Sequence, residues 1–154
     1  MTATARLSEL DITLPAVAAP VAAYVPALRS GDLVYTSGQL PFVDGELPAT
    51  GSVGQDAAVS PDRARDYART ATLNALAAVD ALVGLDSVVQ VVKVVGFVAS
   101  APGFGGQPGV VNGASELLGE IFGDAGAHAR SAVGVAELPL GSPVEIELIV
   151  RVAD

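Results

Sequence analysis

The clearest periodic pattern of apolar positions begins after Ser60-Pro61. Small and aliphatic side chains then recur at spacings of three and four, which is typical of a helix that buries one stripe. Ser60 suits the N-cap, Pro61 the first helical position, and Gly84 the end of this helix. The stripe consists of Ala64, Ala68, Ala71, Ala75, Val79 and Leu82.

A different pattern, alternation between two sides, marks the C-terminal segment Val144–Val152. Alternate side chains of a strand point to opposite faces of a sheet, so one face of this strand is predicted to be buried. The apolar side carries Val144, Ile146, Leu148, Val150 and Val152, and the other side carries Glu145, Glu147, Ile149 and Arg151. A longer run, Val88–Val98, is rich in β-branched residues and predicts a largely buried strand.

The other predicted elements are shorter. Strands are expected at Leu33–Ser37 and Ser131–Glu137, and a second helix at Val110–Phe122, stopped by Gly123. Glycine and proline predict loops at residues 38–50 and 100–109, and a turn at 138–143 that would join the last two strands as an antiparallel pair. Residues 1–31 are expected to be an extended lead-in.

These elements predict one α+β domain over residues 1–154, with a sheet and two helices packed on one face of it. Two helices cannot cover both faces of a sheet. We therefore expect oligomerisation to cover the other face.

Composition narrows the class of protein. Hydrophobic residues make up 51% of the chain, but glycine, proline or charged residues interrupt every apolar stretch, short of the roughly 20 residues of a membrane span. Arg6, Glu9 and Asp11 precede any apolar run, so no secretory signal is predicted and the cytoplasm is the expected location. The chain has no cysteine, which excludes disulfides, thiolate catalysis and cysteine-ligated metals.

The net charge of −9 argues against binding to nucleic acid or to an anionic membrane surface. Only eight residues are Lys or Arg. The densest group is Arg63, Arg65 and Arg69, and it is interleaved with Asp62 and Asp66. This mixture is typical of a solvated helix face.

The last 27 residues hold the candidate chemistry. They contain His128, the single histidine, together with Arg130 and Glu145. An arginine recognises a carboxylate at two points, and a nearby carboxylate can handle a water molecule or a proton. Across a short turn, we expect Glu145 to lie beside Arg130. The alternative is that Arg130 is an ordinary surface residue or an ion-pair partner of Glu145.

Three segments together resemble one known family. Residues 129–147 read A-R-S-x-V-x-V-x-x-L-P-x-G-x-x-V-E-I-E, residues 33–41 read L-V-Y-T-S-G-Q-L-P, and Asn112 follows in the expected order. The chain is similar over Tyr24 to Ala153 to the RidA/YjgF/YER057c/UK114 family. Such membership implies a chorismate-mutase-like fold, a homotrimer and sites in clefts between subunits.

The resemblance also implies an activity, the hydrolysis of reactive 2-imino acids to 2-oxo acids and ammonia by an enamine/imine deaminase. The family's roles would fall on Arg130, which would bind the substrate carboxylate, and on Glu145, which would orient the attacking water. Backbone groups around Gly38 and Ala132 would polarise the reacting centre. No metal and no organic cofactor is implied.

The resemblance places further residues in the pocket, namely Tyr24, Ser37, Gly38 and Asn112. Each has a structural alternative. Gly38 fits a turn or bulge, Tyr24 fits simple packing, and Asn112 fits a helix cap or loop brace.

The chain departs from the family pattern in three places. His128 stands where the family usually has proline, Ala132 stands where cysteine is frequent, and the loop at 100–109 is longer. With these departures the chain resembles a divergent subgroup of the family. His128 is a candidate modulator of the pocket, with a surface role as the alternative.

Two other functions remain open. One is a non-catalytic trimeric module that binds small carboxylates. The other is an endoribonuclease, which the acidic composition disfavours.

Overall fold

The computed structural model describes residues 1–20 and 22–154. In this part of the chain the helices are α1 (Ala3–Glu9), α2 (Pro61–Val83) and α3 (Gln107–Phe122). The strands are β1 (Ala27–Ser30), β2 (Leu33–Thr36), β3 (Val88–Ala99), β4 (Ala129–Val135) and β5 (Val144–Val152).

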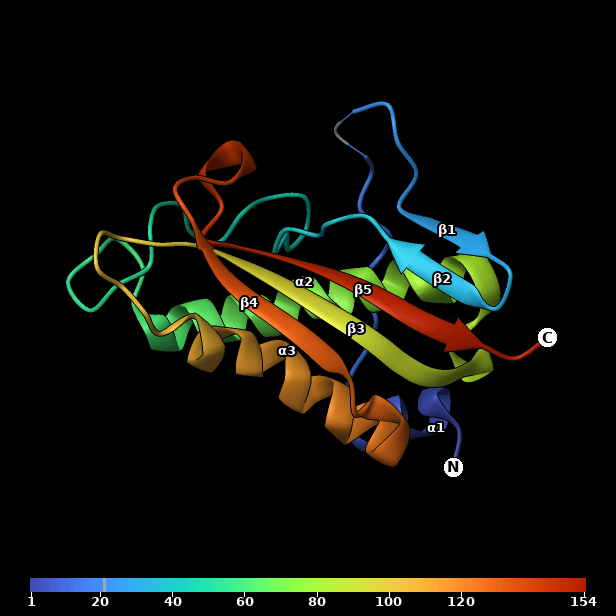
Figure 1. Ribbon diagram of the computed structural model, residues 1–154. Helices are drawn as coiled ribbons and strands as arrows, with labels where there is room; N and C mark the ends of the chain where they lie inside the picture. Colours follow the sequence, from blue (N-terminus) through green and yellow to red (C-terminus); the bar gives the residue numbers. More distant parts are fainter. Residues whose placement is uncertain (21) are drawn as a thin grey trace.

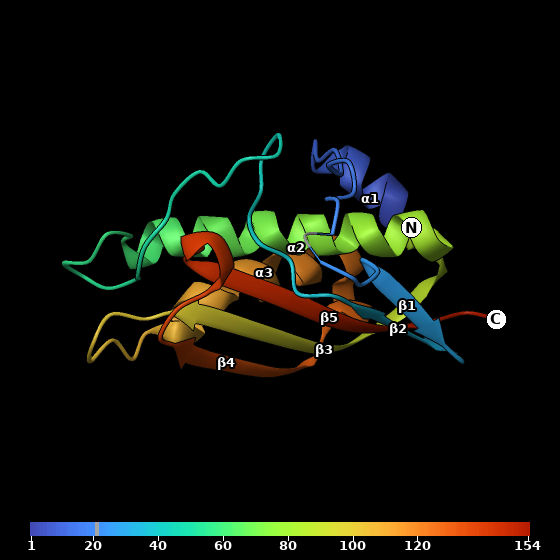
Figure 2. The same cartoon turned by 90° about the horizontal axis from the view of Figure 1, so that it is seen from above.

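The five strands form one mixed sheet in the order β1-β2-β5-β3-β4. Both long helices, α2 and α3, pack on the same face of this sheet, and Figures 1 and 2 show the two layers from the front and from above. The hydrophobic core fills the space between the layers. The predicted α+β architecture is therefore confirmed.

Helix α2 shows how local sequence sets the core. The Ser60 hydroxyl accepts a hydrogen bond from the Arg63 backbone N–H at 3.3 Å, and Gly84 ends the helix with a positive φ of 79°. The predicted bounds of this helix are confirmed. Five members of the predicted stripe, Ala64, Ala68, Ala71, Ala75 and Val79, are fully buried and let the helix lie close against the sheet. The prediction is wrong for Leu82, which is exposed near the end of the helix.

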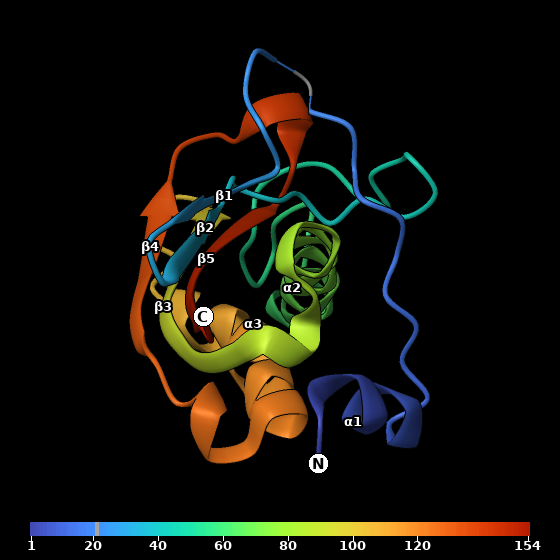
Figure 3. The same cartoon turned by 90° about the vertical axis from the view of Figure 1, so that its right-hand side faces the viewer.

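The prediction of an extended lead-in over residues 1–31 is wrong in part, because it contains α1 and β1. Helix α1 is only seven residues long, too short to show a period. It is anchored by buried Leu7 and by the Thr4 backbone N–H, which donates to Asp86 Oδ1 at 2.8 Å. This hydrogen bond lowers the pKa of the Asp86 carboxyl. Figure 3 shows α1 at the lower end of α3.

The predicted pairing of the last two strands is also wrong. Strand β4 pairs with β3 in parallel, and β5 pairs with the other edge of β3 in antiparallel fashion. The connection between β4 and β5 therefore passes across β3. Arg130 is level with Val94, whereas Glu145 is level with Phe97.

Several boundaries differ by a few residues from those predicted. Helix α3 begins at Gln107, three residues before the predicted start, because Pro108 fits its first turn. Strand β4 begins at Ala129 and ends at Val135, so it lies two residues nearer the N-terminus than predicted.

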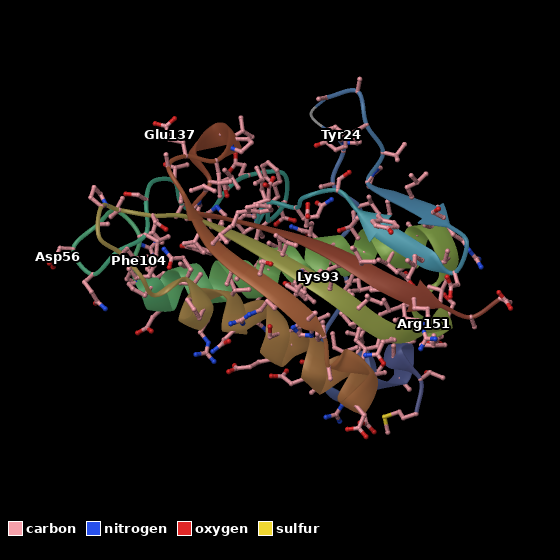
Figure 4. The ribbon with its side chains drawn as sticks, viewed as in Figure 1. Tyr24, Asp56, Lys93, Phe104, Glu137 and Arg151 are labelled. Carbon is pink, nitrogen blue, oxygen red and sulfur yellow. The ribbon has the colours of Figure 1, made fainter. Side chains whose placement is uncertain are left out.

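The face of the sheet that points away from α2 and α3 carries several apolar side chains. Leu28, Tyr35 and Val133 are exposed, and Figure 4 shows Lys93, the single lysine, near the middle of this face. Val95, Phe97 and Ile149 lie on the same face and are half-buried. No helix within residues 1–20 and 22–154 is long and apolar enough to cross a membrane.

Candidate functional site

Arg130 lies on β4 and points toward the helix layer. Its strand partner Val94 is fully buried on that face. The Arg130 Nη1 donates to Asn112 Oδ1 at 2.7 Å and to Ser115 Oγ at 3.3 Å. Among the described residues, none of the three ion pairs includes Arg130. The alternative that Arg130 forms an ion pair with Glu145 of the same chain is therefore wrong.

Asn112 is an internal residue of α3 and not its cap, because the helix begins at Gln107. Its side-chain oxygen instead holds Arg130. Helix α3 can approach β3 and β4 because Gly96 has no side chain, and a Cβ there would collide with Val111 of α3. Ala132, level with Gly96, packs against the core on the same side as Arg130.

His128 belongs to the same group of side chains. Its Nε2 lies 2.8 Å from Ser115 Oγ, and its Nδ1 lies 2.6 Å from the Gly126 carbonyl oxygen. Through Ser115 it is connected to Arg130. His128 remains a candidate modulator, now placed beside the serine that contacts Arg130. The sequence reasoning missed Ser115, although its spacing of three residues from Asn112 on a helix was a usable signal.

Glu145 lies in a second place, at the start of β5. The residue after it, Ile146, exchanges two backbone hydrogen bonds with Gln39, of 2.8 and 3.0 Å. This bridge brings Gly38 against the Glu145 side chain, and a Cβ at Gly38 would lie 2.7 Å from Glu145 Cδ. Gly38 therefore serves a close approach that any larger residue would disturb.

A small cavity of about 60 Å³ opens at this contact. Tyr24, Gly38 and Glu145 line it together, as the resemblance implied for the first two. Phe42 and Pro139, which the sequence reasoning did not single out, add apolar surface to the wall. Figure 4 shows Tyr24 on the loop that precedes β1, beyond the edge of the sheet.

Ser37 does not line this cavity; it braces the loop that carries Tyr24. Its hydroxyl donates to the Val25 carbonyl oxygen at 2.6 Å, and its backbone N–H donates to the Pro26 carbonyl oxygen at 2.9 Å. The structure therefore assigns Ser37 a supporting place beside the pocket.

The electrostatic environment of Glu145 suits proton transfer. Burial raises the pKa of the Glu145 carboxyl, and the negative charge of Glu147 on the same face raises it further. A carboxyl group with a raised pKa binds a proton more readily than an exposed glutamate does. It can therefore accept a proton from water and return it during one reaction cycle.

The two groups of residues lie apart within one chain. Arg130 and Val94 share a level of the sheet, as do Glu145 and Phe97. The levels are three residues apart along β3, roughly 10 Å, and β4 and β5 are two strand spacings apart, again roughly 10 Å. Arg130 also faces the helices while Glu145 faces away from them. The prediction that the two side chains lie beside each other is wrong for a single chain.

Comparison with known proteins agrees with this fold. The family model described as "YjgF/chorismate mutase-like, putative endoribonuclease" matches residues 4–152. Protein TCP17 of Trypanosoma cruzi is 43% identical over 149 residues, which are 96% of this chain and 92% of that protein.

Two solved structures are also similar. Protein Atu1372 of Agrobacterium tumefaciens, described as having unknown function, is 43% identical with a TM-score of 0.89, and the match covers 98% of this chain and 92% of that one. TdcF of E. coli, solved with bound serine, is 27% identical with a TM-score of 0.65, and the match covers 92% of this chain and 96% of that one. The chain therefore belongs to the YjgF/chorismate mutase-like family, as its motifs predicted.

Proposed function

We propose that this protein is an imine deaminase that hydrolyses 2-imino acids to 2-oxo acids and ammonia. One observation carries the proposal. Arg130 has no carboxylate partner among the described residues, and Glu145 has a raised pKa; both belong to the matched segment 129–147 and lie on opposite faces of one sheet. In a 2-imino acid the carboxylate carbon is bonded directly to the imine carbon. Arg130 and Glu145 of the same chain are too far apart to act on both.

The proposed solution is a site between two subunits, in which Arg130 of one copy meets Glu145 of the next. An interface that joins two different surfaces repeats around a ring, and a ring of three copies would hold three equal sites. The exposed side chains of Leu28, Tyr35 and Val133 on the uncovered sheet face support such an assembly, because apolar surface favours burial.

In the proposed reaction Arg130 would bind the substrate carboxylate and so fix the plane of the adjacent C=N group. Glu145 would hold a water molecule, whose oxygen forms a bond to the imine carbon while the C=N π electrons move to nitrogen. The proton lost by the water would pass through Glu145 to that nitrogen. The proton of the new hydroxyl would then pass to the same nitrogen as the C–N bond breaks and the C=O bond forms, which leaves the 2-oxo acid and ammonia.

The bound serine of TdcF supports a small-molecule-binding function for this chain as well. Serine carries an α-carboxylate next to a carbon that bears nitrogen. A 2-imino acid presents the same two groups. We infer that the chain binds ligands of this class.

The first experiment is a coupled assay in which an amino acid oxidase generates 2-imino acids and semicarbazide traps the imine that remains. Wild-type protein should lower the amount of imine that semicarbazide traps, and Arg130→Ala should leave that amount nearly unchanged. Wild-type imine hydrolysis by a folded Arg130→Ala variant would remove the proposed role of Arg130.

A second experiment tests the shared site. Arg130→Ala and Glu145→Gln subunits are each expected to keep only a small residual activity. When equal amounts are unfolded and refolded together, about a quarter of the sites in a random ring would combine an intact Arg130 with an intact Glu145. Recovery of activity to about that level supports sites between subunits. No recovery in a mixed oligomer would place both residues in one chain.

Two alternatives are tested by the same preparations. Binding of pyruvate in calorimetry without faster imine loss would favour a non-catalytic module. Endoribonuclease activity, which the family description names, is disfavoured by the charge of −9 and by the pairing of Arg6, Arg65 and Arg69 with glutamates. RNA cleavage that disappears in Glu145→Gln would overturn this preference.

A further inference from the structure

A chain of hydrogen bonds runs from Arg130 into the protein. Arg130 Nη1 donates to Ser115 Oγ at 3.3 Å, Ser115 Oγ lies 2.8 Å from His128 Nε2, and His128 Nδ1 lies 2.6 Å from the Gly126 carbonyl oxygen. None of these three side chains is fully exposed. These hydrogen bonds can therefore fix the orientation of the guanidinium through its Nη1 atom.

The chemistry of the partners sets the direction of each hydrogen bond. A carbonyl oxygen only accepts, so the His128 Nδ1 carries a hydrogen and donates it to Gly126. In neutral imidazole the other nitrogen, Nε2, is then an acceptor, and the Ser115 hydroxyl donates to it. The lone pairs of that hydroxyl are left to accept from Arg130. All three bonds thus run in one direction.

These contacts leave one edge of the guanidinium available. The two hydrogens of Arg130 Nη1 are directed to Asn112 Oδ1 and to Ser115 Oγ. Within residues 1–20 and 22–154, neither Nε nor Nη2 has a recorded hydrogen-bond partner. Nε and Nη2 form the side of an arginine that binds a carboxylate with two parallel hydrogen bonds.

The Gly126 carbonyl group, which accepts the hydrogen bond from His128, is held in place by packing. Gly126 is buried in the short turn Gly123–Gly126 after α3, and a Cβ there would collide with the Leu118 carbonyl oxygen. Ser115 and Asn112 are three residues apart on α3, so both project from one side of that helix. Helix α3 therefore carries both groups that accept hydrogen bonds from Arg130 Nη1.

We propose that Ser115 and His128 are positioning residues, which hold Arg130 so that its Nε–Nη2 edge receives the carboxylate of the substrate. This inference rests on the proposed function of Arg130. His128, which stands where the family usually has proline, would give this chain a support for the arginine that the family pattern lacks.

A serine next to a histidine is also the arrangement of an activated nucleophile. Here the Arg130 N–H is directed at the oxygen that would have to attack, and it engages the lone pairs of Ser115. The contacts therefore favour a positioning role over covalent catalysis.

The test compares kcat/KM for imine hydrolysis in wild type, Ser115→Ala and His128→Ala. His128→Ala removes a neutral hydrogen bond and is expected to lower kcat/KM by about 3- to 10-fold, whereas Ser115→Ala removes a charge-assisted one from Arg130 and should lower it by about 10-fold or more. Ser115→Thr keeps the hydroxyl, and His128→Gln keeps an oxygen that can accept from it, so both should stay within about 2-fold of wild type. Ser8→Ala, which removes an exposed hydroxyl of α1 bonded to the Thr4 carbonyl, is the control and should match wild type.

An Arg130→Ala background, assayed at higher enzyme concentration, separates positioning from general structural support. Ser115→Ala should have no further effect there, because the group it positions is gone. The same fold loss in both backgrounds would overturn the proposal. Wild-type activity of Ser115→Ala and His128→Ala alongside an impaired Arg130→Ala would overturn it while leaving the proposed function intact. Full activity of Arg130→Ala would remove both.

Discussion

Gly38 lies directly against the carboxyl group of Glu145. A Cβ atom at Gly38 would come within 2.7 Å of Glu145 Cδ and 2.8 Å of Oε1. The backbone bridge between Gln39 and Ile146 fixes this approach. The conformation of Glu145 is therefore controlled by a residue more than 100 positions earlier in the sequence.

This relationship predicts the effect of Gly38→Ala. The Glu145 carboxyl is the end of a flexible side chain, so it should move away at little cost to stability, while imine hydrolysis should fall by about 10-fold or more because the water is no longer oriented. Steady-state kinetics and urea unfolding of the same preparation check this. Gly105→Ala is the control, because a Cβ there meets no atom within 4 Å. Unchanged kinetics in a folded Gly38→Ala protein would contradict the role of the contact.

Replacing Arg130 by lysine should also be costly, although the charge is kept. Lysine is a point charge and cannot contact Asn112 and Ser115 while presenting two parallel N–H groups to a carboxylate. A charge-assisted hydrogen bond contributes about 1.5–3 kcal/mol, so kcat/KM should fall by roughly one to two orders of magnitude. Steady-state kinetics with a series of 2-imino acids would measure this fall in kcat/KM. A lysine variant equal to wild type would show that two-point binding is not needed.

Glu145→Gln should change how stability depends on pH. The pKa of Glu145 is raised in the folded protein above its usual 4.5, so this group favours folding at pH values below the unfolded pKa. That contribution is lost as the pH rises through the folded pKa. Glutamine removes the effect, so the variant should gain stability relative to wild type between about pH 4 and pH 7.

Urea unfolding at these two pH values and one fixed protein concentration measures this difference. Glu46→Gln, at an exposed loop position, is the matched control. If Glu145→Gln showed the same stability difference from wild type at both pH values, the inferred environment of Glu145 would be incorrect.

Helix α3 offers a matched pair of glycines for a packing test. A Cβ at Gly113 would collide with the Arg65 carbonyl oxygen of α2, and this backbone atom cannot easily move. Gly113→Ala should therefore destabilise the protein by about 1–3 kcal/mol. Gly119 is exposed with no atom near its Cβ position, so Gly119→Ala should stabilise by up to about 1 kcal/mol through helix propensity. Chemical denaturation measures the free energy of unfolding of both variants and shows whether it falls for Gly113→Ala and rises for Gly119→Ala.

The elements with a strong local signal were determined by the sequence itself. Ser60, Pro61 and Gly84 specify the bounds of α2, and the alternation of Val144–Val152 specifies which face of β5 is buried. Each signal depends on contacts within one helix or strand, so it can be found without knowing what packs against it. The residues Arg130, Glu145 and Asn112 were likewise found through sequence motifs.

Only the tertiary structure decided how these parts are combined. A short turn suggested that β4 pairs with β5, yet β3 lies between them, because strand pairing depends on which edges remain available after the whole sheet forms. That difference separates the predicted pair by two strand spacings, and the registers of β4 and β5 on β3 place Arg130 and Glu145 on opposite faces. The contact of Ser115 with His128 is decided in the same way, since it depends on how closely α3 packs against β4, and no local pattern encodes that distance.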